Sequence, residues 1–390
     1  MNTTRPGLVR FVLDNSVLLI AGTTAAVVWA NLDFDSYDRI AHRLHFVVND
    51  IGMVFFFALA AKEVFEATLP GGALASPRRA LSPLAAAVGG MVLPALIYLG
   101  LTWVRGPADL ARGWAIPCAT DIAFSAMVAR IVFPAGHPAI PFLLLLAIAD
   151  DALGLIILAL FYPSGTLSVS ALAVLMATAV LFAIWLRRRR VQSFWPYVLG
   201  PGVLSWAALY AGGFHPALAL VPIVPLMPHS PRHLGLFGEH AEYQPDTLNR
   251  FEHWWATPVQ VVLLLFGFAN AGVPLAQIAA GTYYVLAGLL LGKPIGILAF
   301  SGMARLAGGH LPPGLRVSDL FVVGLVAAIG FTVSLFFATA AFPAGAALAE
   351  TKMGALLSLV AAPVAVVVSR LLRVRASWQT EAGTVYKPAG

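Results

Sequence analysis

Apolar runs recur from one end of this 390-residue chain to the other, separated by short segments that carry most of the polar and charged residues. About 20 apolar residues in a row are what an α-helix needs to cross a bilayer. The pattern therefore predicts an all-α integral membrane protein with about twelve transmembrane helices. We place these helices near residues 11–31, 46–66, 80–104, 113–131, 139–162, 166–186, 194–210, 213–227, 256–274, 282–304, 319–342 and 352–373.

The composition supports a single membrane domain. The chain is 59% hydrophobic and only 11% charged, whereas soluble domains carry about 25% charged residues. A soluble fold of this length could not bury so much apolar surface. We expect one transporter domain over residues 1–390. The first apolar segment, near Phe11 to Ala30, is too long for the core of a signal peptide, so we interpret it as a retained span.

The basic residues predict an orientation. With the N-terminus inside, 18 of the 24 Lys and Arg residues fall in inner segments and 5 in outer loops, and Lys293 lies within the membrane. This bias obeys the positive-inside rule and places both tails, 1–10 and 376–390, in the cytoplasm. The net charge of +6 is then a consequence of topology rather than of nucleic-acid binding. The run Arg187–Arg190 fits an anchor against anionic lipid.

Four ionisable residues lie inside predicted spans. Asp150 and Asp151 stand side by side near the middle of the apolar run 143–160, and Asp121 and Lys293 occupy comparable places in two other spans. A charge at the centre of a bilayer costs roughly 2.5–3.5 kcal/mol on insertion scales, so such residues are retained for a function. They indicate a path for cations and protons. The alternative for Asp150 and Lys293 is a structural salt bridge that only joins two helices.

Two spans contain helix-breaking residues at mid-membrane depth. Pro117 precedes Thr120 and Asp121 in the fourth span, and Gly330 precedes Thr332 in the eleventh. Either break alone is compatible with a tolerated kink. Breaks in corresponding places of two halves indicate a transporter with inverted-topology repeats, here helices 3–5 and 10–12. Crossed half-helices would leave partial charges at their ends, for which Asp121 suits the positive ends and Lys293 the negative ends.

The positions of Asp150 and Asp151 on one helix predict different roles for the two side chains. Adjacent helical residues point about 100° apart, so only one of the two can face a given cavity squarely. The other is expected to face Lys293. A dehydrated sodium ion needs several oxygen ligands, which Asp151, Asp150, Thr120 and unwound carbonyls could supply. Because desolvation disfavours a bare carboxylate, the pair would be either protonated or bound to a metal ion. Release of a proton from Lys293 as sodium draws Asp150 away is a further hypothesis.

Several ordered motifs carry a resemblance to a known family. They are GGMVLPALIYL at 89–99, GWAIP at 113–117 with TDIAF at 120–124, LAIADD at 146–151, ALFY at 159–162, FANAGV at 268–273, GKPIG at 292–296 and GFTVS at 330–334. In this order they resemble the NhaA family of bacterial sodium/proton antiporters over nearly the whole chain. Any one of these motifs is weak evidence, but the ordered set is specific.

The resemblance implies a multi-pass protein of the bacterial inner membrane, with helices 4 and 11 unwound and crossed. It implies an electrogenic secondary transporter, not an enzyme, that exports Na⁺ or Li⁺ in exchange for a larger number of entering protons and so serves pH homeostasis. No cofactor is implied beyond the transported ions. In family terms Asp151 is the main ion ligand, Asp150 its partner engaged with Lys293, Asp121 the dipole compensator, and Thr120 a lining residue. The family's pH response maps onto Glu63, Glu252, His253 and His215.

The chain departs from the family pattern in two places. The inner end of helix 2, KEVFEATLPGG at 62–72, has a thinner cluster of charges, which puts the pH response in doubt. A solvated charge at Glu252 and an ordinary histidine at His253 remain alternatives to a sensor. The first outer loop, Asn31 to Asp50, is short and acidic, whereas family members that dimerise through this region have a longer loop. A homodimer and a monomer both remain open.

Three other classes of protein compete with this interpretation. A sodium-coupled symporter of the bile-acid-transporter-like fold shares broken helices but needs no buried Asp-Asp pair. An intramembrane aspartyl protease needs its two aspartates on different helices that face each other. A channel would show no proton dependence. The single cysteine, Cys118, excludes a disulfide within the chain and leaves no Cys/His cluster for a metal.

Overall fold

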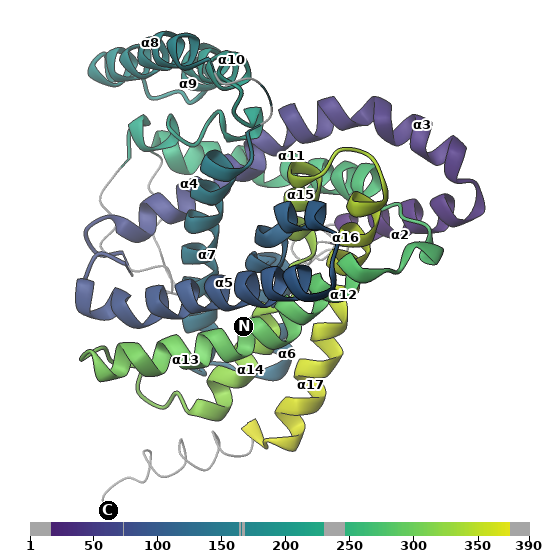
Figure 1. The fold of residues 1–390 in the computed structure, drawn as a ribbon. Helices are drawn as coiled ribbons and strands as arrows, with labels where there is room; N and C mark the ends of the chain where they lie inside the picture. The colour runs from purple at the N-terminus through teal and green to yellow at the C-terminus, as the bar shows by residue number, and fades with distance from the viewer. Residues whose placement is uncertain (1–16, 73, 164, 166–167, 230–245, 375–390) are drawn as a thin grey trace, which may run out of the picture. The chain divides into compact units, whose positions relative to one another are not determined.

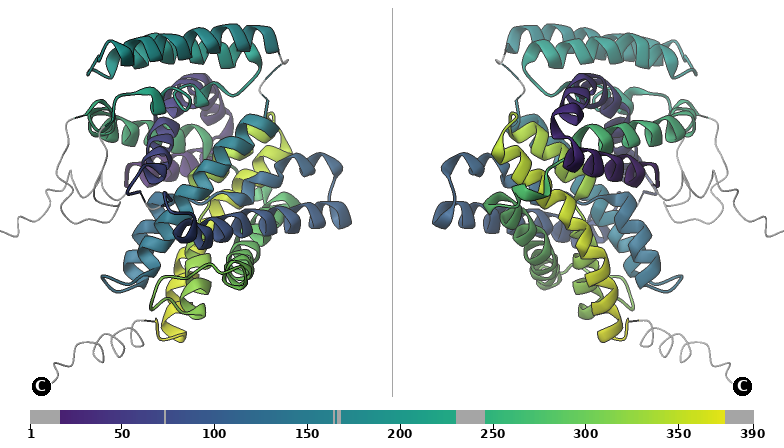
Figure 2. Two further views of the ribbon diagram at one scale, coloured as in Figure 1. Left: turned by 90° about the vertical axis from the view of Figure 1, so that its left-hand side faces the viewer. Right: turned by 90° about the vertical axis from the view of Figure 1, so that its right-hand side faces the viewer.

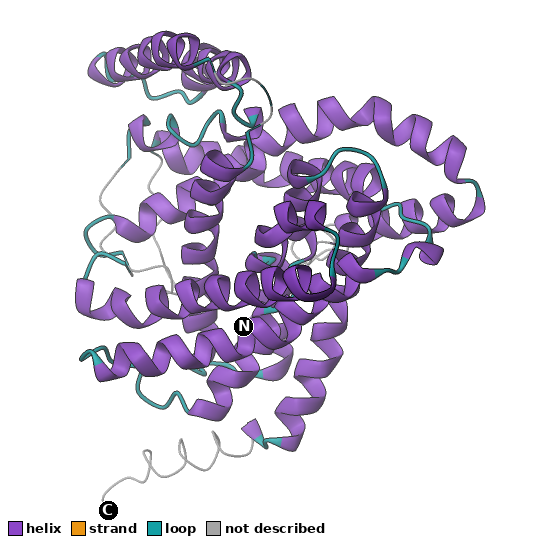
Figure 3. Ribbon diagram, in the orientation of Figure 1, coloured by secondary structure: helices purple, strands orange, loops and turns teal. Residues whose placement is uncertain are grey.

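A computed structural model describes residues 17–72, 74–163, 165, 168–229 and 246–374, with the backbone alone at 77–79. Throughout these residues every regular element is a helix (Figure 3). The predicted tails and the start of the first span lie outside the described residues. The expectation of an all-α protein is confirmed.

Six helical segments are long and apolar enough to cross a membrane. They are 34–68, 80–105, 139–161, 169–188, 280–306 and 346–371. Two bent helix pairs bring the number of candidate spans to as many as eight, and α2 (Val17–Leu32) is a shorter apolar helix. The exact number of twelve stays a prediction.

Two sequence-based expectations about local structure are wrong. The segment 213–227 holds only two short 3₁₀ turns, η4 (Pro216–Leu218) and η5 (Val224–Leu226), because its prolines lack the N–H that an α-helix needs. The expected outer loop 31–50 is instead largely helical. There α3 (Phe34–His45), capped by the Asp33 carboxylate, continues through the π-helical segment η1 (Phe46–Gly52) into α4 (Met53–Thr68).

The described chain forms two compact units, and α7 (Ala139–Phe161) contributes to both. The first unit comprises residues 1–75, 151–277 and 339–343. In it α2 packs against α11 (Thr247–Asn270), and α8 (Val169–Arg188) lies beside α10 (Val203–Gly212), as Figure 2 shows. The short elements of this unit are α9 (Trp195–Tyr197), η3 (Val198–Gly202) and η6 (Leu275–Gln277).

The second unit comprises residues 76–150, 278–338 and 344–390. Its centre is the pair α5 (Pro77–Arg105) and α13 (Lys293–Leu306), which lie side by side (Figure 1). The backbones approach so closely at Gly89 and Gly296 that a Cβ on either glycine would collide with the carbonyl oxygen of the other. Further helical elements of this unit are α12 (Ala280–Ala287), η7 (Gly288–Gly292), α16 (Ala346–Leu357), η8 (Ser358–Val360) and α17 (Ala361–Leu371).

Two helices of the second unit are interrupted, as the sequence predicts. The 3₁₀ segment η2 (Ala108–Cys118) and α6 (Ile122–Val132) meet at a bend of 53°, and α14 (Val317–Ala327) and α15 (Phe331–Ala341) at one of 51°. The first break follows Pro117, and the second contains Gly330. The segment η2 rests on α5, where the Cys118 thiol donates a hydrogen bond to the Met91 carbonyl over 3.3 Å.

Candidate functional site

The two helix breaks lie against each other within the second unit. The Asp121 N–H, in the first break, donates to the Ile329 carbonyl, in the second break, over 2.7 Å. Ala328, Ile329 and Thr120 are fully buried. Because buried backbone groups need partners, this bond satisfies an N–H of the first break and a carbonyl of the second.

The Asp121 carboxylate binds the N-termini of two half-helices. Its Oδ1 accepts from the Phe124 N–H, at the start of α6, over 3.1 Å. Its Oδ2 accepts from the Thr332 N–H, at the start of α15, over 3.2 Å, and from the Thr332 hydroxyl. Both helix starts carry partial positive charge and unpaired N–H groups, so one carboxylate stabilises both. The Ser358 hydroxyl accepts from the N–H groups of Gly330 and Phe331 and completes the cap of α15.

Hydroxyl groups meet the carbonyl ends of the other two half-helices. Ser334 donates to the Ile116 carbonyl over 2.7 Å, and Ser125 donates to the Val326 carbonyl over 3.0 Å. The Thr120 hydroxyl lies 3.1 Å from the Ala327 carbonyl. Lys293 makes no hydrogen bond to these carbonyls, so its compensation of the negative ends stays a prediction. The sequence predicted Thr120 as a lining residue but not the bonds of these three hydroxyls to the carbonyl ends; the serines four residues after each break are the signal that could have revealed two of the bonds.

Lys293, Asp150 and Thr120 form a closed polar cluster. The Lys293 Nζ lies 3.0 Å from Asp150 Oδ2 and 2.5 Å from the Thr120 hydroxyl oxygen, and both charged side chains are 0% exposed. The Thr120 hydroxyl also lies 2.7 Å from Asp150 Oδ2. It has one proton, which it can donate either to Asp150 or to the Ala327 carbonyl. The other oxygen of Asp150, Oδ1, is buried without a hydrogen-bond partner among the described residues.

Local helix geometry explains why a lysine can stand here. Lys293 follows the π-helical turn η7 within the continuous helical segment 280–306, and Pro294, which has no N–H to donate, comes directly after it. Gly292 lies against Pro94 of α5, so closely that a Cβ there would meet the proline backbone. The GKPIG motif therefore allows α13 to pack closely against α5, and this packing buries Lys293.

Asp151 differs from Asp150 in its surroundings. It follows Asp150 on α7 and is partly exposed, whereas Asp150 is buried. The helical turn between neighbours directs the two carboxylates about 100° apart. Asp150 is thus the member of the pair that contacts Lys293, as expected, and Asp151 is the less buried member.

The residues matched to a pH response fall in two places of the first unit. Lys62 on α4, buried at 2% exposure, pairs with Glu66 over 2.9 Å and with Glu252 on α11. Glu63 is the neighbour of Lys62 on α4, and His253 is exposed. Lys62 was not predicted as a site residue, although a Lys and a Glu four residues apart in an apolar helix indicate an ion pair.

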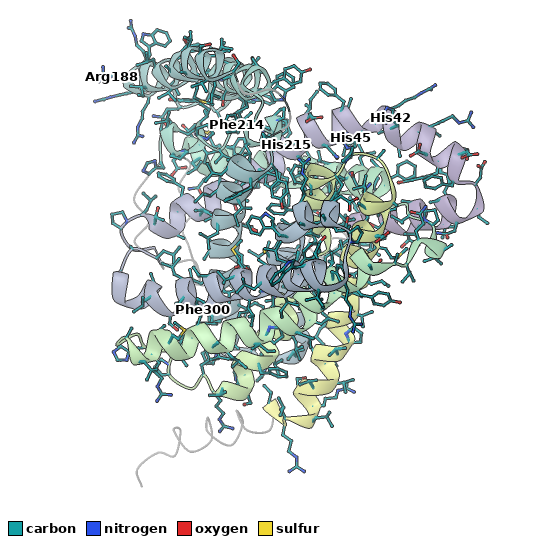
Figure 4. The ribbon with its side chains drawn as sticks, viewed as in Figure 1. His42, His45, Arg188, Phe214, His215 and Phe300 are labelled. Atoms are coloured by element: carbon teal, nitrogen blue, oxygen red, sulfur yellow. The ribbon has the colours of Figure 1, made fainter. Side chains whose placement is uncertain are left out.

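His215 lies apart from the cluster around Lys62. It caps η4, where its Nδ1 accepts from the Ala217 N–H over 3.3 Å. It lies close enough to His45 for their charges to interact, and both are labelled in Figure 4. The described part of the chain contains no group of three His, Cys, Asp or Glu side chains that could hold a metal ion. The donors around the breaks are oxygen atoms of carboxylates, hydroxyls and carbonyls, the kind that hard cations prefer.

Comparison with known proteins agrees with this architecture. Residues 9–369 match the model of the family described as Na+/H+ antiporter 1. The chain is 46% identical to the Na(+)/H(+) antiporter NhaA of Desulfitobacterium hafniense, over 97% of this chain and 100% of that protein. It is 46% identical to the Na(+)/H(+) antiporter NhaA of Geobacter metallireducens, over 92% of this chain and 96% of that protein.

A solved structure shares the fold at low sequence identity. The sodium proton antiporter MjNhaP1 of Methanocaldococcus jannaschii aligns with a TM-score of 0.54 and 18% identity, over 91% of each chain. The family expected from the sequence motifs is therefore confirmed: this chain is a multi-pass membrane protein that belongs to the Na+/H+ antiporter 1 family.

Proposed function

We propose that this protein is a secondary active transporter, not an enzyme, that exchanges Na⁺ for H⁺ across the membrane. The observation that carries the proposal is the buried Lys293–Asp150 pair beside two helix breaks, with one Asp150 oxygen unpartnered. Such a pair inside a membrane marks an ion or proton pathway. The names of the relatives, Na(+)/H(+) antiporter NhaA, support the same activity.

Competition between a proton and a metal ion for the same carboxylates would drive the exchange. Asp151, Asp150, Thr120 and unwound carbonyls would bind dehydrated Na⁺, and protons would replace it on the carboxylates. When Na⁺ engages Asp150, Lys293 loses its partner and, in an apolar environment, releases its proton. More than one proton would then enter for each Na⁺ that leaves, which makes the exchange electrogenic. Li⁺, which has the same charge and favours the same oxygen ligands, is expected to be an alternative cargo.

The setting of the transporter follows from the charge bias and the repeat pattern. We infer an inner-membrane protein with about twelve helices, cytoplasmic tails and crossed helices 4 and 11. The Asp121 carboxylate would compensate the positive ends of the half-helices, and Gly330 and Thr332 would shape the second interruption. Glu63, Glu252, His253 and His215 would adjust activity to pH, with the Lys62–Glu252 ion pair as the supporting contact. A homodimer remains a proposal that mass measurement in detergent would test.

A sodium-coupled symporter of the bile-acid-transporter-like fold is the main alternative. Everted membrane vesicles separate the two. Respiration first acidifies their interior, and NaCl is then added. An antiporter dissipates the proton gradient, whereas a symporter or a channel for Na⁺ leaves it in place. A fluorescent pH dye reports the difference. Vesicles that carry Asp151→Asn are the matched control. The measurement covers about three pH units, from pH 6 to 9, a range that brackets ordinary histidine titration. The proposal is refuted if the wild-type protein reaches the membrane but gives no dye response to Na⁺ or Li⁺ in this range.

A further inference from the structure

Two serines tie the interrupted helices together in a reciprocal way. Ser125, on α6, donates to the Val326 carbonyl, in the last turn of α14, over 3.0 Å. Ser334, on α15, donates to the Ile116 carbonyl, near the end of η2, over 2.7 Å. Each serine is the fourth residue of the half-helix that follows one break, and each acceptor lies before the other break. The arrangement follows the inverted repeat of the two helices.

These bonds differ from the usual behaviour of a serine within a helix. A helical serine commonly bonds to a carbonyl three or four residues earlier in its own helix. Here the carbonyls of Asp121 and Gly330, four residues earlier, accept the backbone N–H groups of Ser125 and Ser334. The side chains instead reach the other interrupted helix. Both serines are buried, so water does not supply the acceptors in their place.

The two bonds bracket the polar cluster. The Val326 carbonyl precedes the Ala327 carbonyl, which lies 3.1 Å from the Thr120 hydroxyl. The Ile116 carbonyl belongs to the segment that ends just before Thr120. The Thr120 hydroxyl, in turn, contacts both Lys293 and Asp150. A shift of α14–α15 along η2–α6 would therefore separate the Ala327 carbonyl from the Thr120 hydroxyl, and a matching shift of η2–α6 would also move that hydroxyl relative to Asp150.

We propose that Ser125 and Ser334 are positioning residues that fix the two breaks against each other and thereby set the affinity of the Thr120–Asp150 site for Na⁺. This inference rests on the proposed Na⁺/H⁺ exchange. It predicts that loss of either hydroxyl weakens the binding of Na⁺ more than it slows turnover at saturating Na⁺. A serine with a purely structural role would lower the amount of folded protein without changing the Na⁺ concentration at half-maximal rate.

The test compares Ser125→Ala, Ser334→Ala, the double variant and Ser369→Ala. Ser369 is the matched control, because its hydroxyl bonds within its own helix, to the Val366 carbonyl over 2.8 Å. Everted vesicles give the apparent KM for Na⁺ and the maximal rate at fixed pH. Purified protein in detergent gives the rise in melting temperature on addition of NaCl, which measures binding without transport.

Each single Ser→Ala change is expected to raise the apparent KM for Na⁺ roughly 3- to 10-fold, the effect of one lost buried hydrogen bond, and to reduce the thermal shift in parallel. Ser125→Thr and Ser334→Thr, which keep the hydroxyl, should stay nearer to wild type, and Ser369→Ala should match it. If an alanine variant does not accumulate, Ser→Cys, a similar shape with a weaker donor, is measured against the same criterion.

Three outcomes would overturn the inference. They are an unchanged KM in both serine variants, an equal rise in Ser369→Ala, or threonine variants that behave as the alanine variants do. Failure of the proposed function itself looks different, since wild-type vesicles and Ser369→Ala would then show no response to Na⁺ at all. Normal wild-type exchange with unaltered serine variants removes the positioning role alone.

Discussion

The ammonium group of Lys293 and the carboxylate of Asp150 form an ion pair that solvent does not reach, with Nζ 3.0 Å from Oδ2. The pair joins α13 to α7, and Thr120 binds both of its members. Burying two charges is costly, and their mutual attraction offsets that cost only while both are present. The pair therefore makes the stability of the protein depend on the state of the proposed transport site.

Removing one partner of this pair should destabilise the protein strongly. Lys293→Ala and Asp150→Asn should each cost about 3–5 kcal/mol, because each leaves a buried group without its partner. The double variant should lose less than the sum of the single losses. Thermal unfolding in detergent of the four proteins gives the coupling through a double-mutant cycle. Losses that simply add would show that the two groups do not stabilise each other.

Lys293→Arg separates charge from proton release. An arginine keeps the positive charge but does not give up its proton near neutral pH. If Lys293 carries one of the exchanged protons, this variant should remain folded yet transport with less charge moved per Na⁺. Current measurements on proteoliposomes, divided by ²²Na⁺ flux, report this ratio. A wild-type ratio in Lys293→Arg would exclude the lysine as a proton carrier.

Asp151→Asn should abolish Na⁺-driven proton movement while leaving the protein folded. The amide keeps the shape of the side chain but removes the charge that would bind the ion. Because Asp151 is partly exposed, whereas Asp150 is buried against Lys293, the loss of the Asp151 charge should change stability less than the loss of the Asp150 charge does. Asp150→Asn is the comparison, since it should lose both stability and transport. Normal exchange by Asp151→Asn would refute its assignment as the main ligand.

Loss of the Asp121 carboxylate should destabilise both interrupted helices. Its carboxylate accepts from the first turns of α6 and α15, and the loss of one helix cap costs about 0.5–2 kcal/mol. Asp121→Ala should therefore cost about 1–4 kcal/mol, and Asp121→Asn, which keeps one acceptor oxygen, about half as much. Melting temperatures in detergent check the order. Thr332→Val, which removes only one donor to Asp121, should be milder than either.

Glu252 and His253 are adjacent but should not be equivalent. Glu252 pairs with the buried Lys62, whereas the His253 side chain is exposed. Glu252→Gln should cost about 0.5–1 kcal/mol, since Glu252 is itself partly exposed, and it should flatten the dependence of the exchange rate on pH. His253→Gln, at an exposed side chain, should alter the pH profile less than Glu252→Gln does. The measurement is the Na⁺ response of everted vesicles at a series of pH values; equal effects of the two changes would contradict a special role of Glu252.

Sequence reasoning was strongest where the membrane leaves few alternatives. An apolar environment contains few partners for Lys293, so its pairing with Asp150 could be predicted from the position of two residues. Pro117 and Gly330 likewise predicted the breaks, because both interfere with a regular helix. By contrast, Lys62 and Glu252 lie 190 residues apart, and no periodicity links them. The serine bonds were also missed, since a hydroxyl in an apolar helix gives no indication of which carbonyl it will reach.

The local errors have a similar explanation. Hydropathy registers the apolar side chains of 213–227 but not the missing N–H groups of its prolines, so it predicted a helix where only short turns form. In 31–50 the charged side chains suggested a loop. Asp35 and Arg39 instead stand one turn apart on α3, a spacing that favours a solvated helix, and the Arg39 side chain binds the Asp35 carbonyl over 3.1 Å.

Cys118, the one thiol of the chain, lies at the end of η2 with its sulfur against the Met91 carbonyl of α5, and it is 1% exposed. Because the sulfur is buried, its alkylation requires a motion that exposes it, such as separation of η2 from α5. The alkylation rate of the unaltered protein thus reports how often this sulfur becomes exposed, and no engineered label is needed to measure it. If Na⁺ holds the interrupted helices in one arrangement, adding Na⁺ should change the alkylation rate of Cys118 without any change in the intrinsic reactivity of the thiol.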